Sequence, residues 1–119
     1  MGDIITKIGS GNSFGGDLTI AHKIENSLNQ VAELKNDELR TAITSLAEHV
    51  YQLCAQLPAD KAADTIHYLE QLLLEAKRAK PRPKWYELSA EGLIDSAKAV
   101  GGIGQQVVAA VGEVLKLLR

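Results

Sequence analysis

Apolar residues recur in alternating steps of four and three toward the C-terminus of the chain. The series is Leu93, Ala97, Val100, Gly104, Val107, Val111, Val114 and Leu118. Only a helix gathers residues at this spacing on one side, so the pattern predicts one long amphipathic helix over residues 89–118, with Ser89 as a candidate N-cap. Glycines at 101, 102, 104 and 112 predict either a kink near 101–104 or close approach of a neighbouring backbone.

Shorter apolar stripes with the same period occupy residues 23–79. They run over residues 24–34, 39–57 and 62–76. Asn36 and Asp37 interrupt the first stripe and supply N-cap chemistry, so the early part is either one kinked helix or two helices. Pro58 ends the second stripe. Because the turn around Pro58 is short, we predict an antiparallel helical hairpin over residues 23–79.

The first 21 residues follow a different pattern. Ile4, Ile5 and Ile8 precede a cluster rich in glycine, asparagine and serine, and Leu18 to Ile20 follow it. β-Branched residues on both sides of a turn-forming cluster predict two short strands. We therefore expect a β-like, glycine-rich arm over residues 1–21, which needs helices or another chain to pack against.

Composition favours one mainly α domain over residues 1–119. The hydrophobic fraction is 45%, but only 4% of the residues are aromatic. A core of leucine, isoleucine, valine and alanine suits helix packing, and a chain of 119 residues can bury such a core without metals or disulfides. We expect a helical bundle that joins the antiparallel hairpin to the long C-terminal helix, with the arm attached.

Targeting signals are not evident in the sequence. The first residues lack the basic stretch and apolar run of a secretory signal, and no window supplies 18 uninterrupted apolar residues. We expect a cytoplasmic location, with membrane association through the C-terminal helix left open.

No group of residues has the spacing of a catalytic or metal site. The glycines at 9, 11, 15 and 16 lack the Lys-Ser/Thr pair of a phosphate loop and are expected to form turns. Asp64, His67 and Glu70 share one helical face, but no second helix offers matching ligands. The single cysteine, Cys54, occupies an apolar position, where burial as a small hydrophobe is expected. We expect no enzyme, no cofactor and no metal site.

Charge is segregated along the chain. The net charge is −2, yet residues 37–76 carry a net −5 and residues 77–86 a net +5. Prolines at 81 and 83 do not fit a helix interior, so residues 80–88 are predicted to be a linker. We expect the basic segment to dock on acids such as Glu70 and Glu75, within one chain or between copies. Its cations are Lys77, Arg78, Lys80, Arg82 and Lys84, and they adjoin Trp85 and Tyr86.

This basic and aromatic segment is a candidate recognition site. Its cations could hold phosphates while an aromatic ring stacks on a base or enters a lipid interface. The competing interpretation is structural. The cations would then complement the dipole of the preceding helix, and Trp85 would pin the last helix to the hairpin.

The C-terminal helix offers a second candidate interaction face. A helix over residues 93–118 would be about 39 Å long, which exceeds the length of the hairpin helices. We expect the uncovered part to pack on a second copy, so the chain should form a homo-oligomer. The face comprises Val100, Gly104, Val107, Val111 and Val114.

Two stretches resemble segments of a known kind of protein. One is GNSFGGDLTIA at residues 11–21, continuing through residues 24–27, and the other is KWYELS at residues 84–89, with residues 92–94. They are similar to short segments of uncharacterised bacterial multidomain proteins, some of which look like conflict or programmed-death signalling proteins. The resemblance implies a helical adaptor or effector-associated module that is able to self-assemble, and no functional residue transfers with it.

The sequence therefore predicts a non-enzymatic interaction and oligomerisation module with a protein partner, in the setting of bacterial defence signalling. Two alternatives stay open. The C-terminal helix could insert into a membrane, as in a small membrane-active effector, although it carries four charged residues, Asp95, Lys98, Glu113 and Lys116. The basic linker could serve a nucleic-acid accessory protein, although the net charge of −2 disfavours that alternative.

Overall fold

The computed structural model describes residues 18–119, which form five helices and no strand. They are α2 (Leu18–Val31), α3 (Asp37–Cys54), α4 (Ala59–Ala76), α5 (Pro83–Lys98) and α6 (Ile103–Leu118). The expected mainly α bundle is confirmed for this part of the chain.

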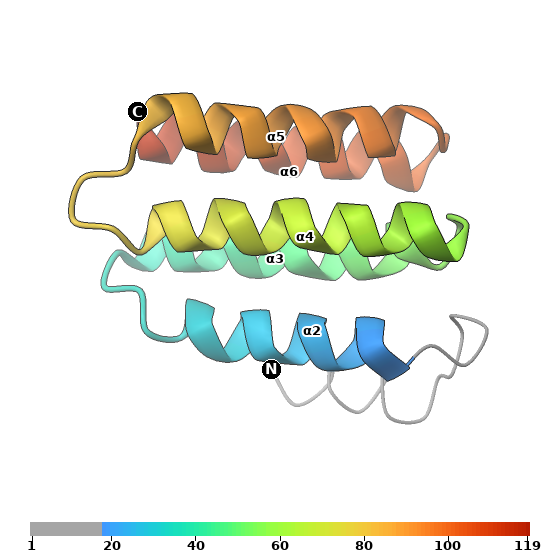
Figure 1. Cartoon of the computed structure of the whole chain (residues 1–119). Coiled ribbons are helices and arrows are strands. Elements are labelled where there is room, and N and C mark those ends of the chain that lie inside the picture. Colours follow the sequence, from blue (N-terminus) through green and yellow to red (C-terminus); the bar gives the residue numbers. More distant parts are fainter. Residues whose placement is uncertain (1–17) are drawn as a thin grey trace.

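Four of the helices make an antiparallel bundle. Helix α3 packs on α4, α4 on α5, α5 on α6, and α6 returns to α3, so each occupies one corner of a square. Helix α2 lies outside this square, against α3 and α4 (Figure 1). The connections 32–36 and 77–82 and the C-terminus share one end of the bundle, and the turns 55–58 and 99–102 share the other.

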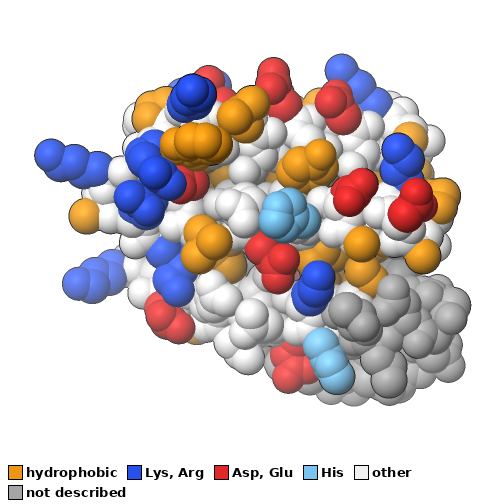
Figure 2. Space-filling view, viewed as in Figure 1, with side chains coloured by type: hydrophobic (Ala, Val, Ile, Leu, Met, Phe, Trp, Pro, Cys, Tyr) orange, Lys and Arg blue, Asp and Glu red, His pale blue; other side chains and the backbone are white. Residues whose placement is uncertain are grey.

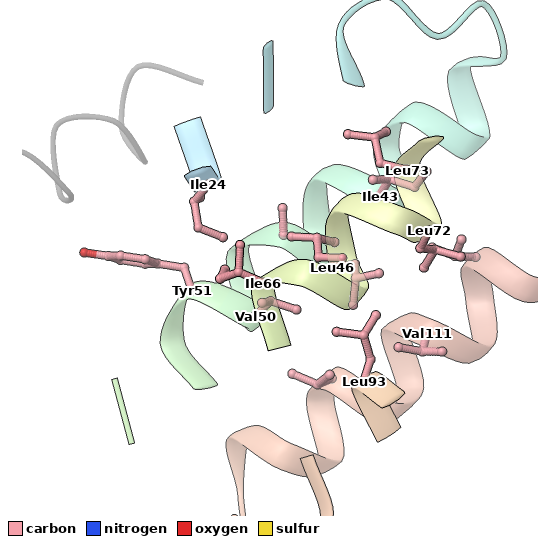
Figure 3. Close-up of a cluster of buried hydrophobic side chains, with 14 of the residues drawn as sticks. Ile24, Ile43, Leu46, Val50, Tyr51, Ile66, Leu72, Leu73, Leu93 and Val111 are labelled. Carbon is pink, nitrogen blue, oxygen red and sulfur yellow. The ribbon is translucent and has the colours of Figure 1, made fainter. Parts of the chain in front are cut away.

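Apolar side chains from every described helix meet in one continuous core. Leu46 of α3, Leu72 of α4 and Leu93 of α5 have no exposed surface, nor does Val111 of α6. Figure 3 shows them converging, with Ile24 of α2 reaching the core from outside the square. Each leucine of this kind contributes about 1.5–3 kcal/mol through burial, so this packing is a large stabilising contribution to the fold.

The break between α2 and α3 follows local capping chemistry. The Asn36 side chain accepts a hydrogen bond from the backbone N–H of Leu39 at 3.0 Å. Asp37 and Glu38 lie in the first turn of α3, where they complement the helix dipole. The early part is therefore two helices, and residues 23–79 hold three helices rather than the predicted hairpin alone. The α3–α4 pair is antiparallel, as expected (Figure 1).

The prediction of one long C-terminal helix over 89–118 is wrong. Helix α5 ends at Lys98, and α6 begins at Ile103 after a turn in which Gly102 has φ of +66°. A Cβ on Gly104 would lie 2.1 Å from the carbonyl oxygen of Ala97, so the two backbones approach closely there. The turn spans about one helical repeat, which lets the apolar period continue across it. For this reason the sequence pattern did not reveal the break.

The predicted linker over 80–88 is also wrong at its C-terminal side. Helix α5 begins at Pro83, which occupies its first turn, where a missing N–H costs nothing. Ser89 is therefore not an N-cap. Its hydroxyl donates to the carbonyl oxygen of Trp85, 3.2 Å away, inside the helix.

The predicted β-like arm over 1–21 is wrong where it overlaps the described residues. Leu18 to Ala21 form the first turn of α2. Ile20 and Ala21 are buried in the core, which explains the apolar character that suggested a strand. The remaining part of that prediction, including Ile4, Ile5 and Ile8, lies outside the described residues.

Candidate interaction surface

Basic side chains gather at the end of the bundle where α4 passes into α5. Figure 2 shows the lysine and arginine side chains projecting from this end on the face that carries α4 and α5. The contributing residues follow the C-terminus of α4 or open α5: Lys77, Arg78, Lys80, Arg82 and Lys84.

One buried carboxylate fixes the path of the chain around this corner. The Glu75 residue at the end of α4 is only 6% exposed. It accepts hydrogen bonds from the backbone N–H of Arg82 at 3.2 Å, from its Nε at 3.1 Å and from its Nη2 at 2.5 Å. The Nε of Arg78 lies 3.8 Å from the same carboxylate. The expected docking of cations on Glu75 is confirmed, whereas Glu70 has no ion pair among the described residues.

The pairing of Glu75 with Arg82 favours the charged form of both side chains. The side-chain hydrogen bond from Arg82 is the main cause that holds the pKa of Glu75 below its ordinary value, against the opposing effect of burial. The bond to Glu75 in turn raises the pKa of Arg82. The carboxylate also lies at the N-terminus of α5, where the helix dipole favours a negative charge.

Trp85 lies beside this ion pair and is half exposed, at 48%. The guanidinium Cζ of Arg82 is 5.6 Å from the ring centroid and the Nζ of Lys84 is 5.7 Å from it, so both cations contact the indole. Leu88, one turn further along α5, is 50% exposed. An exposed indole, an exposed leucine and two cations therefore share the first two turns of α5.

The aromatic residue that is buried in the core at the start of α5 is Tyr86 rather than Trp85. Tyr86 is only 2% exposed and packs in the core with Leu93, seven residues later. That spacing is two helical turns, so extending the apolar stripe backward from Leu93 would have identified Tyr86 as the buried aromatic. Trp85, its neighbour, must then point away from the core centre.

The cations at this end differ in their partners. The Nζ of Lys77 lies 3.6 Å from Glu33 of the α2–α3 connection. Among residues 18–119, Lys80 and Lys84 have no ion pair. We use the name basic-aromatic surface for Lys80, Arg82, Lys84, Trp85 and Leu88.

The second predicted interaction face is part of the core. Val107, Val111 and Val114 have no exposed surface, Gly104 is buried against Ala97, and Val100 in the α5–α6 turn is partly buried. Because the 39 Å helix does not exist, the length argument for a second copy on this face does not hold. Sequence periodicity identified these residues as interior positions but assigned the wrong partner to them.

A second surface feature was not anticipated from the sequence. The seam between α3 and α6 is hollowed into a groove of about 480 Å³. Its lining combines acidic, hydroxyl and apolar side chains: Asp37, Glu38, Thr41, Ala42, Ser45, Glu113 and Leu117. The adjacent acids Asp37 and Glu38 were visible in the sequence, but their alignment with Glu113 depends on the α5–α6 turn that the sequence did not reveal.

The other candidate chemistry is not assembled by the fold. No cluster of three or more histidine, cysteine or acidic residues that could hold a metal occurs in residues 18–119. His67 is exposed beside Tyr68, with ring centroids 6.4 Å apart. Cys54 is buried, and its Sγ lies 3.7 Å from the carbonyl oxygen of Ala62. No helix in the described part has both the length and the apolar composition that a membrane span requires.

Comparison with known proteins gives no family for this chain. No protein-family model matches it, and no solved structure matches it either.

Proposed function

We propose that this protein is a non-enzymatic helical interaction module, and that the basic-aromatic surface binds a protein partner. The observation that carries the proposal is the half-exposed Trp85, whose ring centroid lies 5.6 Å from the Arg82 guanidinium and 5.7 Å from the Lys84 ammonium, on a helix that the core fixes in place. Tryptophan and arginine are the residues most enriched among those that dominate binding energy at protein interfaces. Exposure of such a residue beside Leu88 gives a compact apolar centre with a charged rim.

The chemistry of the partner follows from this arrangement. Lys80 and Lys84 carry charges that no described acid neutralises, so the partner should present carboxylates around an apolar pocket. A single exposed indole provides no row of aromatic rings for successive bases, which disfavours a nucleic-acid partner. The resemblance of residues 84–89 and 92–94 to uncharacterised bacterial multidomain proteins, some of which look like signalling proteins, falls on α5 itself and supports an adaptor role.

Trp85 is the only tryptophan in the chain, so its fluorescence tests the proposal directly. The full chain is titrated with three probes: an acidic amphipathic helical peptide, vesicles of phosphatidylglycerol, and a single-stranded oligonucleotide. We expect the peptide to shift the emission to shorter wavelength in a saturable manner that weakens with salt. A shift that is larger and tighter with vesicles or with the oligonucleotide would overturn the protein-partner assignment.

A matched pair of variants assigns any binding to the surface. Lys84→Gln removes a cation beside Trp85, whereas Lys61→Gln removes an exposed cation at the opposite end of α4. Binding of the acidic peptide should weaken at least threefold for Lys84→Gln and remain unchanged for Lys61→Gln. Equal loss in both variants would indicate non-specific attraction by net charge.

A further inference from the structure

We infer that one partner of the basic-aromatic surface is a second copy of this chain, whose acidic groove between α3 and α6 receives Trp85. This inference rests on the proposed function and names the occupant of the same surface. The groove fits the surface in its charges, in its volume and in its position on the molecule.

The groove matches the surface in charge. The Asp37 carboxylate pairs with Arg40, its neighbour along α3. Glu38 and Glu113 line the groove and have no ion pair among the described residues. Lys80 and Lys84 on the basic-aromatic surface likewise have no ion pair among the described residues. The two carboxylates on the α3–α6 side of one copy can therefore pair with the two ammonium groups on the α4–α5 side of another.

The groove also matches the surface in size and polarity. Ala42 and Leu117 provide apolar lining, while Thr41 and Ser45 place hydroxyls along one wall. The groove is open to solvent along the seam, and its volume of about 480 Å³ leaves room for a side chain to lie in it. An indole ring with a neighbouring leucine is a group of that scale, and the hydroxyls can accept a hydrogen bond from the indole N–H.

The two features lie on opposite sides of the bundle. Gly92, two turns after Trp85 on the same side of α5, lies against the Tyr68 ring of α4, so Trp85 belongs to the α4–α5 side. The groove belongs to the α3–α6 side, which Figure 1 shows behind α4 and α5. A chain cannot place Trp85 in its own groove. Contact between copies is therefore head to tail, and it generates a ring or an open filament rather than a two-fold dimer.

A head-to-tail contact permits a mixing experiment with full-length variants. The first variant, Trp85→Ala, keeps the groove but loses the indole. The second, Glu38→Lys with Glu113→Lys, keeps the indole but reverses the groove charges. The control, Asp64→Lys with Asp95→Lys, makes the same charge change in the groove between α4 and α5. All five positions are exposed in the single chain, and circular dichroism checks that each variant folds.

Sedimentation velocity and Trp85 fluorescence are the two measurements. We expect the unaltered chain and the control to self-associate at high micromolar concentration and low salt. Each of the other two variants should remain monomeric under these conditions, because its association is weakened at least tenfold. Mixing the two monomeric variants should form a one-to-one pair. Because Trp85→Ala contains no tryptophan, the emission of the mixture reports only the indole of the second variant, and it should shift to shorter wavelength.

Three results would overturn the inference. They are a monomeric unaltered chain at several hundred micromolar, self-association that survives in either variant, and a mixture that stays monomeric without a spectral shift. The proposed function is judged separately by the acidic peptide. A monomeric chain that still binds this peptide at Trp85 removes the second copy as partner but leaves the proposed function, whereas loss of both removes both.

Discussion

At the scale of single residues, Glu75 organises the corner on which the candidate surface is built. Its carboxylate joins the end of α4 to the beginning of α5 through three hydrogen bonds to Arg82. The pair places the guanidinium within 5.6 Å of the Trp85 ring. A structural ion pair and a recognition surface therefore share one arginine, and disturbing the first should disturb the second.

Replacing this carboxylate should lower stability. Glu75→Gln keeps the shape of the side chain but removes the charge that Arg82 pairs with, and hydrogen bonds to charged groups contribute about 1.5–3 kcal/mol. We expect a loss of about 1–2 kcal/mol in the free energy of unfolding, measured by urea denaturation. Glu70→Gln on the same helix is the control and should change it by less than about 0.5 kcal/mol. Equal effects would show that the pair is not stabilising.

The same carboxylate predicts a dependence on pH. The folded-state pKa of Glu75 is lowered from its ordinary value of 4.5. Its contribution is therefore complete above pH 4.5 and is lost as the pH falls through the lower folded-state pKa. Other carboxylates titrate in this range, so the measurement is the stability difference between the unaltered chain and Glu75→Gln. That difference should be constant near neutral pH and shrink in acid. A difference that grows in acid would contradict the assigned sign.

At the scale of elements, the sequence predicted features that depend on neighbouring residues, but not those that depend on how the helices pack. The Asn36 cap and Pro58 each act on their own neighbours. The sequence therefore predicted the break at Pro58 and marked an interruption at Asn36, although it left open whether that interruption was a kink or a break. The α5–α6 turn was not, because it preserves the apolar period. Whether Trp85 or Tyr86 enters the core depends on where α5 begins. Because the sequence pattern placed that start at Ser89, it did not include either residue in the helix and could not decide between them. The sequence identified the cations and aromatic residues of the basic-aromatic surface, but their arrangement in space became clear only from the fold.

Two glycines in α6 test the account of this turn. A Cβ at Gly104 would meet the Ala97 carbonyl, whereas a Cβ at Gly112 would meet nothing within 4 Å. Gly104→Ala should therefore destabilise the chain by about 1–3 kcal/mol through overpacking. Gly112→Ala should stabilise it by about 0.5–1 kcal/mol, since alanine has the higher helix propensity. Thermal unfolding separates the two, and a stabilising Gly104→Ala would place α5 and α6 differently.

At the scale of the whole molecule, the α5–α6 hairpin closes the core rather than offering a long free helix. Leu93 of α5 and Val111 of α6 are buried and project toward the side chains of α3 and α4 (Figure 3). The interaction surface therefore lies on the outside of a completed bundle, at the corner that Glu75 holds. A partner can bind there without opening the core.

Because the predicted interaction face on α6 is part of the core, a charged substitution there should impair folding rather than association alone. Val107 has no exposed surface, so Val107→Asp would bury an unpaired carboxylate. We expect a loss of more than about 3 kcal/mol, seen as loss of the cooperative thermal transition in circular dichroism. A folded chain whose only defect is weaker association would restore the interpretation of this face as an interface. Val108→Asp, at a more exposed neighbouring position, is the control and should fold.

The central claim is that Trp85 and Leu88 form a binding surface, and site-specific photo-crosslinking in cells that express the chain tests it most directly. A photoreactive amino acid replaces Leu88 in one protein and Ala63, exposed on α4 away from both surfaces, in another. The account predicts a covalent adduct of discrete mass from position 88, lost when Trp85→Ala is added, and none from position 63. No adduct from position 88, or the same adducts from both positions, would contradict it.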